Sequence, residues 1–409
     1  MRKLAVLSFH TSPLVQPGVG DSGGMNVYVR ELVAALAQAG VACDVYTRRW
    51  HAELPPEVPI EPGFRVVHVA AGPPDLVPKE DLPTFVEEFA AGVLGHLRAG
   101  DGADAIHANY WLSGVAGHSL KHDLDLPLVS TFHTLARVKA EVDEPEPDDR
   151  VDAETKVIGC SDAILASCVE EAADLERHYD APPDRIEIVP PGVDHAFFSP
   201  GPRAGARAAL GMDADDPPDR PLLLFVGRIQ PLKGLDIAVA SLAHLGRADA
   251  RLLVVGGPSG RHGDAELAKA VELARALGVS DRVAFTEPKP HHLLSTYYRA
   301  ADVVLVPSRS ESFGLVALEA AACGTPVVAA AVGGLRTVVD HGHTGFLVEG
   351  RDPAVFAAYV DEILDNAVLA GELRQAATAR SRRYTWSTAA ARLRRLYADL
   401  TARSLVECR

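Results

Sequence analysis

The sequence predicts an α/β protein made of two tandem doubly wound domains that face each other across a cleft. Short apolar runs alternate with helical patterns along the whole chain, which is typical of parallel sheets covered by helices. The runs form two series, separated by a segment rich in proline and acidic residues. The length of 409 residues also favours two domains over one.

The first half carries the first series of predicted strands. Each run is short and apolar, as expected for a strand buried on both faces. Apolar side chains then recur at helical spacing in 25–39, a predicted amphipathic helix that Gly40 ends. The predicted strands are residues 4–9, 42–47, 64–69, 105–107 and 128–132.

The second series of predicted strands occupies residues 222–226, 251–255, 283–286, 303–306, 327–330 and 346–348. Proline and acidic residues are dense between the two series, so we expect the interdomain hinge at 196–220. The predicted domains are therefore 1–198 and 199–384.

Two further segments have predicted roles in this arrangement. The arginine-rich, amphipathic segment 385–409 is expected to form a closing helix that packs back on the N-terminal domain. The acidic, proline-bearing segment 141–150 is expected to be an irregular loop near the cleft.

Composition narrows the possible partners and the compartment. The 40 basic and 55 acidic residues give a formal net charge of -15, which disfavours nucleic acid and anionic membranes as partners. The first apolar run is too short for a signal peptide, and no run is long enough to span a bilayer. The five cysteines are widely spread without a Cys-x-x-Cys pair, so we expect reduced thiols, no cysteine metal site and a cytoplasmic protein.

Two cations follow the first predicted strand of the second half. Arg228 comes just after residues 222–226, and a turn keeps Lys233 close to it. Two converging cations can neutralise the charge that develops on a diphosphate leaving group. The alternative is a solvated surface pair at the start of a helix.

Two carboxylates, Glu311 and Glu319, accompany an apolar helix further along the second half. A carboxylate inside such a helix needs a partner, and a ribose diol can donate two hydrogen bonds to it. The alternatives are a structural salt bridge for Glu319 and a helix cap for Glu311. The amides at the helix start are expected to meet the phosphates, at Phe313, Gly314 and Leu315.

A glycine-rich loop, residues 18–26, joins the first predicted strand to the first helix. Such a loop can present backbone amides to an anion, and its Asp21 and Asn26 can bind hydroxyl groups. His10 and His133 each follow a predicted strand and are expected at the same cleft. The alternatives are an ordinary flexible loop and two structural histidines.

These motifs resemble those of a known family. Gly227-Arg228…Lys233-Gly234 and Glu311-Ser-Phe-Gly-Leu…Glu319 resemble the retaining GT-B glycosyltransferases of the glycogen synthase and sucrose-phosphate synthase group. His10-Thr-Ser-Pro…Gly-Gly-Met-Asn-Val-Tyr28 is similar to the D-inositol-3-phosphate glycosyltransferases of mycothiol biosynthesis, as are Asn109-Tyr-Trp-Leu-Ser-Gly114 and Thr131-Phe-His-Thr-Leu-Ala-Arg-Val-Lys139. The resemblance covers nearly the whole chain.

The resemblance implies a set of functional residues. UDP-N-acetylglucosamine would be held by Gln16, Pro17, Gly24, Arg228, Lys233, Lys289, Glu311 and Glu319. The acceptor, 1D-myo-inositol 3-phosphate, would be held by His10, Asp21, Ser22, Gly23, Gly24, Met25, Asn26, Lys79, Tyr110, Thr134 and Arg150. The catalytic residues would be His133, Arg228, Lys233 and Glu311.

The family also implies a homodimer and a structural magnesium ion near Tyr298, Arg299, Ala301 and Thr325, with no cofactor required for the chemistry. The chain departs from the family in residues 140–144, which are shorter and more acidic. The predicted activity is therefore transfer of N-acetylglucosamine to inositol phosphate, with release of UDP. The alternatives are a transferase with another acceptor, such as a sucrose-phosphate synthase, and a non-catalytic sugar-nucleotide sensor.

Overall fold

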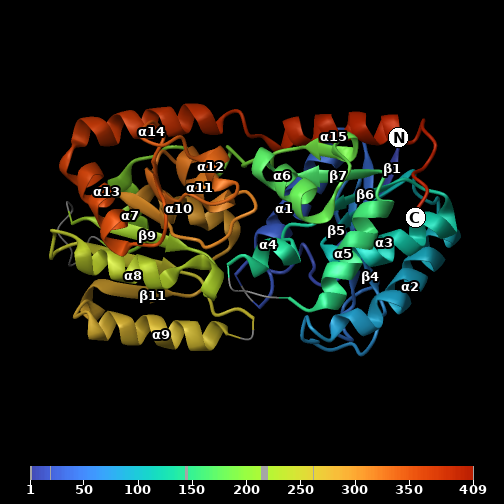
Figure 1. Cartoon of the computed structure of the whole chain (residues 1–409), viewed down its shortest axis with the longest axis horizontal. Helices are drawn as coiled ribbons and strands as arrows, with labels where there is room; N and C mark the ends of the chain where they lie inside the picture. The colour runs from blue at the N-terminus through green and yellow to red at the C-terminus, as the bar shows by residue number, and fades with distance from the viewer. Residues whose placement is uncertain (1, 19, 143–145, 213–219, 261, 409) are drawn as a thin grey trace. The chain divides into compact units, whose positions relative to one another are not determined.

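The computed structural model describes residues 2–18, 20–142, 146–212, 220–260 and 262–408 (Figure 1). The chain divides into two compact units. The first unit consists of Met1–Val15, Met25–Gly192 and Trp386–Arg409, and the second of Gln16–Gly24 and Val193–Thr385. The glycine-rich loop therefore groups with the second unit, and the C-terminal segment groups with the first.

The first unit is built on an eight-stranded sheet with the order β3-β4-β2-β1-β5-β6-β7-β8. All neighbouring strands are parallel except β3 and β4. The order reverses direction beside β1, as in a doubly wound sheet, which confirms the predicted class. The strands are β1 (Lys3–Leu7), β2 (Ala42–Arg48), β3 (Glu57–Glu61), β4 (Phe64–Val69), β5 (Ala105–Asn109), β6 (Leu128–Thr131), β7 (Ala163–Ala166) and β8 (Ile186–Ile188).

Helices cover both faces of this sheet because side chains of its central strand alternate between two apolar clusters. Leu4 and Val6 pack with α1 and α15, whereas Ala5 and Leu7 pack with α2 and α3. The helices of this unit are α1 (Gly24–Gln38), α2 (Val86–Ala99), α3 (Trp111–Leu124), α4 (Ala136–Ala140), α5 (Asp148–Cys160), α6 (Val169–Tyr179) and α15 (Trp386–Leu400).

The second unit contains a six-stranded parallel sheet with the order β11-β10-β9-β12-β13-β14. This is the order 3-2-1-4-5-6 of a Rossmann sheet, in which β9 and β12 lie side by side at the point where the order reverses. The strands coincide with the predicted ones: β9 (Leu222–Val226), β10 (Arg251–Val255), β11 (Val283–Thr286), β12 (Val303–Val306), β13 (Val327–Ala330) and β14 (Phe346–Val348).

Helices again surround the sheet of the second unit (Figure 1). One apolar core joins its strands to α8, α9 and α13. The helices are α7 (Arg203–Ala209), α8 (Leu235–His244), α9 (Gly263–Ala276), α10 (Leu294–Ala300), α11 (Leu315–Ala322), α12 (Leu335–Val338), α13 (Pro353–Asp365) and α14 (Ala367–Ser381).

Helix α15 is anchored in the first unit through aromatic and polar contacts. Trp386 packs edge-on against Tyr28 of α1, with ring centroids 5.7 Å apart. The Tyr397 hydroxyl is 2.8 Å from Nδ1 of His107, whose Nε2 is 2.8 Å from Thr131 Oγ1. Within the described part of the chain, no helix is long and apolar enough to cross a membrane.

Two predictions about irregular segments need comment. The expectation of a loop over 141–150 is wrong at its end, because Asp148 begins α5 and Arg150 is buried in that helix. The acidic side chains Asp148 and Asp149 favour the positive end of the helix dipole, which explains why the acidic run starts a helix. Residues 143–145 and part of the predicted hinge, 213–219, lie outside the described residues.

The expectation of five reduced thiols is also wrong for two cysteines. Cys160 at the end of α5 and Cys408 of the C-terminal segment are joined as a disulfide, although 248 residues separate them in the sequence. No spacing pattern could indicate this contact, because the fold alone brings the two segments together. The other three cysteines are buried and form no disulfide: Cys43, Cys168 and Cys323.

Candidate functional site

The glycine-rich loop contacts residues that follow strands of the second unit. Ser259 Oγ donates to the carbonyl of Gly20 at 2.6 Å, and Arg228 Nη1 lies 3.3 Å from the carbonyl of Asp21. A side chain at Gly23 would meet the guanidinium of Arg228, with Nε only 2.9 Å from its Cβ. The structure therefore brings Arg228 and the glycine-rich loop together, and a larger residue at position 23 would displace the guanidinium from this position.

The start of this loop is held by residues near Lys289. Gln16 Nε2 donates to the carbonyl of Pro288 at 2.9 Å, and Lys289 follows directly in the chain. A Cβ at Gly18 would also touch Pro288. Three residues assigned to the donor by resemblance, Gln16, Pro17 and Lys289, are thus neighbours in the second unit.

Lys233 and Glu311 form an ion pair beyond the ends of β9 and β12. Lys233 Nζ is 2.6 Å from Glu311 Oε2, which also accepts from Ser308 Oγ at 3.2 Å. Gly234 makes this close arrangement possible: its φ is +71°, and a Cβ there would lie 2.1 Å from the Pro307 carbonyl. The cation and the carboxylate come together because their strands are neighbours in the sheet.

The N-terminus of α11 follows this pair. Gly314 caps the helix in a left-handed conformation, with φ of +99°. Phe313 is buried and packs edge-on against Tyr384, whereas Leu315 begins the helix half-exposed. The first amides of α11 have no carbonyl partners within the helix, so this end favours a negatively charged group.

Glu319 lies in the middle of α11 and is buried, with 5% of its surface exposed. One carboxylate oxygen is 2.7 Å from His291 Nε2, and the other accepts from the Tyr298 hydroxyl at 2.8 Å. Burial and Glu319 together raise the pKa of Tyr298 well above its ordinary value. The alternative of a structural role for Glu319 therefore holds in part, because His291 and Tyr298 provide hydrogen-bond partners for both of its carboxylate oxygens.

The segment that the resemblance connects with magnesium lies next to Glu319. Thr325 Oγ1 donates to the carbonyl of Tyr298 at 2.6 Å, and Arg299 donates to the carbonyls of Ser199 and Phe197. Ala301 follows α10. These contacts tie α10 to the start of β13, and the magnesium site stays a prediction.

In the first unit, two histidines and a tyrosine gather beyond the ends of β1, β5 and β6. The rings of His10 and Tyr110 are 4.3 Å apart, and His133 Nε2 is 2.9 Å from Asn109 Oδ1. Tyr110 and His133 both have positive φ, 76° and 62°. Positive φ at such bulky residues is strained, and strain of this kind concentrates at functional sites.

His133 is held as a neutral base. Burial, together with nearby His107, lowers the pKa of His133 to about 3. Its ring also packs edge-on against Tyr28. At neutral pH the imidazole therefore carries no charge and can orient a hydroxyl group through a hydrogen bond.

Arg150, Thr134 and Tyr110 come together from three separate segments. Arg150 Nη2 donates to the carbonyl and the Oγ1 of Thr134, at 3.0 and 3.1 Å. Its guanidinium lies over the Tyr110 ring, 5.1 Å from the centroid. Its Nε pairs with buried Glu154 at 2.8 Å, which fixes the guanidinium plane.

A fourth group, the carboxylate of Glu146, was not predicted for this cluster. Glu146 Oε1 is 2.9 Å from Arg150 Nη1 and also contacts Lys139 Nζ. Burial opposes the charged form, yet Arg150, Lys139 and Lys79 lower the pKa of Glu146. Lys79 is thus close enough to act on the same carboxylate. Glu146 lies four residues before Arg150 but outside α5, so helical spacing could not indicate this contact.

The remaining residues predicted for the acceptor hold the start of α1. Asn26 is buried, and its amide donates to Thr11 Oγ1 at 2.7 Å and to the carbonyl of Ser12 at 2.6 Å. The carbonyl of Ser22 accepts from the Gly18 amide at 2.8 Å, which closes the loop on itself. Gly24 and Met25 begin α1 directly after it.

The chain matches two protein families. Residues 22–197 match the family described as Glycosyltransferase Family 4, and residues 213–383 match the family described as Glycosyl transferases group 1. The two matches correspond closely to the two units.

Similar proteins are found along the full length. The chain is 50% identical to the D-inositol 3-phosphate glycosyltransferase of Xylanimonas cellulosilytica, over 98% of the chain and 97% of that protein. It is 46% identical to the D-inositol 3-phosphate glycosyltransferase of Thermobispora bispora, over 98% and 96%.

Solved structures give the same result for the fold. The sucrose-phosphate synthase of Thermosynechococcus elongatus superimposes with a TM-score of 0.91 at 34% identity, over 98% of this chain and 100% of that one. Anabaena HepE in complex with UDP and glucose superimposes with a TM-score of 0.78 at 18% identity, over 98% and 100%, which shows a shared fold.

Proposed function

The chain belongs to the D-inositol 3-phosphate glycosyltransferase family of GT-B enzymes, and on this premise we propose its reaction. It moves N-acetylglucosamine from UDP-N-acetylglucosamine to 1D-myo-inositol 3-phosphate, with retention of the anomeric configuration. The observation that supports this acceptor is the cluster in which Arg150 contacts Thr134 and Tyr110. Lys79 and Arg150 both lower the pKa of the Glu146 carboxylate, so Lys79 belongs to the same cluster.

The acceptor cluster suits a phosphate better than a neutral sugar. Arg150 offers a planar donor fork whose orientation Glu154 fixes, and Lys79 adds a second cation. The hydroxyl groups of Thr134 and Tyr110 can donate to the remaining phosphate oxygens. An unphosphorylated polyol would offer these cations no anionic group of its own.

The donor cluster suits a nucleoside diphosphate sugar. Arg228 and Lys233 are the cations for the two phosphates, and the start of α11 adds backbone amides. Glu319, already held by Tyr298 and His291, is placed to accept from a ribose hydroxyl through its carboxylate lone pairs. Glu311 is the candidate for the hydroxyl groups of the transferred sugar.

The chemistry follows from the charges. The acceptor hydroxyl oxygen attacks the anomeric carbon from the face that UDP leaves, the bond to the β-phosphate oxygen breaks, and this oxygen takes the hydroxyl proton. Arg228 and Lys233 stabilise the negative charge on the leaving phosphate. Neutral His133 orients the transferred sugar without exchanging a proton.

The test is a matrix of donors and acceptors. UDP- and GDP-sugars are combined with inositol 1-phosphate, inositol 3-phosphate, unphosphorylated inositol, glucose and fructose 6-phosphate, and both UDP release and the product are measured. We expect turnover with UDP-N-acetylglucosamine and inositol 3-phosphate, and loss of turnover when the phosphate is absent. Turnover confined to fructose 6-phosphate would refute the proposed acceptor.

One second function is favoured by a specific observation, the 34% identity and TM-score of 0.91 with a sucrose-phosphate synthase. The same matrix decides between the two, because that enzyme class uses a sugar phosphate as acceptor. Binding of a UDP-sugar without any product would instead indicate a sensor. The homodimer remains a prediction, which sedimentation of the purified protein would test.

A further inference from the structure

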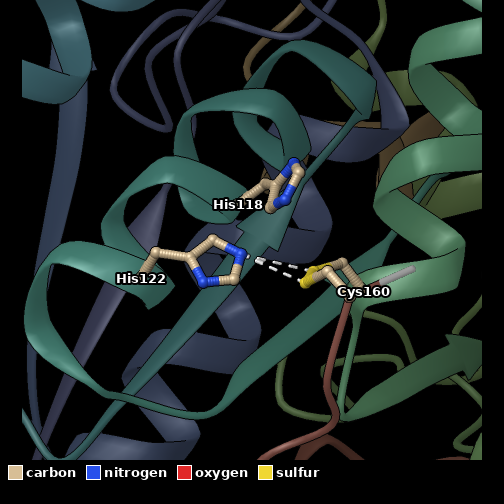
Figure 2. Close-up of side chains that lie close together, drawn as sticks. His118, His122 and Cys160 are labelled. Atoms are coloured by element: carbon tan, nitrogen blue, oxygen red, sulfur yellow. Dashed lines mark hydrogen bonds between the residues drawn. A yellow bond between two sulfur atoms is a disulfide. The ribbon is translucent and has the colours of Figure 1, made fainter.

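Four side chains of the first unit converge on one point at the surface, and none of them belongs to the donor or acceptor clusters described above. His118 and His122 lie one turn apart on α3, Cys160 ends α5, and Cys408 belongs to the C-terminal segment. Their ligand atoms all lie within 4.8 Å of one another. Figure 2 shows the His122 ring nitrogen directed at the sulfur atoms, with His118 beside it on the same helix. We call these four residues the His2Cys2 cluster.

Within this cluster His122 contacts both sulfur atoms and the ring of His118. His122 Nε2 is 3.1 Å from Cys408 Sγ and 3.6 Å from Cys160 Sγ. The rings of His118 and His122 meet edge to face, with centroids 5.1 Å apart. Ligand atoms of a tetrahedral zinc ion are about 3.3–3.8 Å apart, from bond lengths of ~2.0–2.3 Å. Once the disulfide is reduced, the two sulfur atoms are free to separate to this spacing, and side-chain rotations then complete the tetrahedron.

A disulfide accounts for only part of this arrangement. It needs the two cysteines, but it gives no reason for two imidazoles to have nitrogen atoms within 4.8 Å of the sulfur atoms. Two thiolates and two imidazoles are the usual ligand set of structural zinc, and the two thiolate charges balance Zn²⁺. We propose that the dithiol form of the His2Cys2 cluster binds one zinc ion.

The surrounding residues hold the ligands in place independently of a metal. Buried Lys121 donates to the carbonyl of Cys160 and to Asp162 Oδ2, both at 2.8 Å. The other oxygen of Asp162 accepts from the amide of Val406 at 2.7 Å, two residues before Cys408. Asp162 thus fixes the C-terminal segment beside α5. Hydrogen bonds that hold the ligand residues in this way commonly set the geometry of metal sites.

The charge balance around the cluster also permits a cation. Lys121 is paired with Asp162, so its charge is compensated close by. The thiolates remain as the uncompensated negative groups once their protons leave on metal binding. The zinc ion would then connect α3, α5 and the C-terminal segment, and the disulfide is the form of the same cysteines after loss of two electrons and two protons.

The experiment measures metal content of the full chain without an affinity tag, after reduction with a phosphine, which supplies the two electrons. Metal analysis should find about one zinc per chain after incubation with zinc chloride and gel filtration. Cobalt should replace zinc and give the intense visible bands of a tetrahedral site, with a thiolate-to-metal charge-transfer band. Cys408→Ser removes one of the two thiolates and should reduce that band to about half or less, and His122→Ala should weaken zinc binding by more than about 100-fold.

Matched variants separate this site from adventitious binding. His51→Ala, at an exposed histidine of the same unit, and Cys323→Ala, at a buried free thiol, should both keep one zinc per chain. Cys408 and His122 are partly or fully exposed, so their substitution should leave the circular dichroism spectrum unchanged. Reduced protein that binds no zinc, or zinc binding that survives both Cys408→Ser and His122→Ala, would overturn the proposal.

Discussion

Replacing Glu146 with glutamine should strengthen binding of the phosphorylated acceptor. In the ligand-free structure, the Glu146 carboxylate contacts Arg150 and Lys139, and Lys79 helps to keep it ionised. A phosphate bound to Arg150 would therefore lie beside a negative charge of the protein. Glutamine keeps the shape of the side chain and removes that charge.

The expected change in acceptor affinity follows from the distance between the two negative charges. Two anions on one guanidinium lie about 6 Å apart, where two unit charges repel each other by ~2.8 kcal/mol at an effective dielectric constant of 20. Lys139 and solvent screen part of this repulsion, so we take about half, ~1.4 kcal/mol, which is a tenfold change in affinity. Glu146→Gln should thus lower KM for inositol 3-phosphate about tenfold, with kcat and KM for the UDP-sugar nearly unchanged.

The assay is initial-rate UDP release at saturating donor and low ionic strength, with acceptor concentration varied. Glu141→Gln serves as a matched control, because Glu141 is an exposed acid of the same acidic segment that pairs with Arg177 and His178. The difference in acceptor KM between Glu146→Gln and wild type should become smaller as salt is added, because salt screens the repulsion. A higher KM in Glu146→Gln would refute the reasoning and would mean that Glu146 holds Arg150 in its binding position.

Three other substitutions test the donor side and the fold. Lys233→Ala should lower kcat by about 100- to 1000-fold at saturating donor, whereas the exposed Lys269→Ala should not; wild-type turnover in Lys233→Ala would exclude the leaving-group role. Glu319→Gln should raise KM for the UDP-sugar by about 10-fold or more, the effect of losing a charged hydrogen bond, and leave KM for the acceptor unchanged. Burial raises the pKa of Glu171 from 4.5 to about 7, so the folded protein keeps a proton that the unfolded chain has lost, and stability falls as pH rises through this window. Glu171→Gln should therefore be more stable than wild type at pH 8 by roughly 1–3 kcal/mol and little different at pH 4, as thermal unfolding would show.

The sequence identified most strands because their burial is nearly complete. A strand in the middle of a parallel sheet, such as β10 or β12, needs apolar side chains on both faces and gives an unbroken apolar run. The strands that escaped prediction are β3, β7 and β8. β3 and β8 lie at the edges of the sheet, with mixed sequences EVPIE and IEI, and β7 is a short run of four residues.

The two clusters differ in how far sequence could reveal them. Lys233 and Glu311 follow β9 and β12, so parallel pairing of these strands brings them together, and position after a strand was enough to nominate both. Arg150 instead lies inside a helix, and its contacts with Thr134 and Glu146 depend on how α5 packs. Spacing along the chain carries no information about such a contact, so only the resemblance nominated Arg150.

Glu146 also has a consequence for the stability of the ligand-free protein. Without a phosphate, Lys79, Lys139 and Arg150 would repel one another, and the carboxylate of Glu146 compensates them. The negative charge of Glu146 therefore stabilises the empty site and weakens binding of the acceptor phosphate. A ligand that binds only the folded state stabilises it more, the higher its affinity. Without acceptor, Glu146→Gln should therefore have a lower melting temperature than wild type. With saturating inositol 3-phosphate, its melting temperature should rise by more than that of wild type. If the variant has a lower melting temperature but its ligand-induced increase is no larger than that of wild type, Glu146 has a structural role and does not compete with the phosphate.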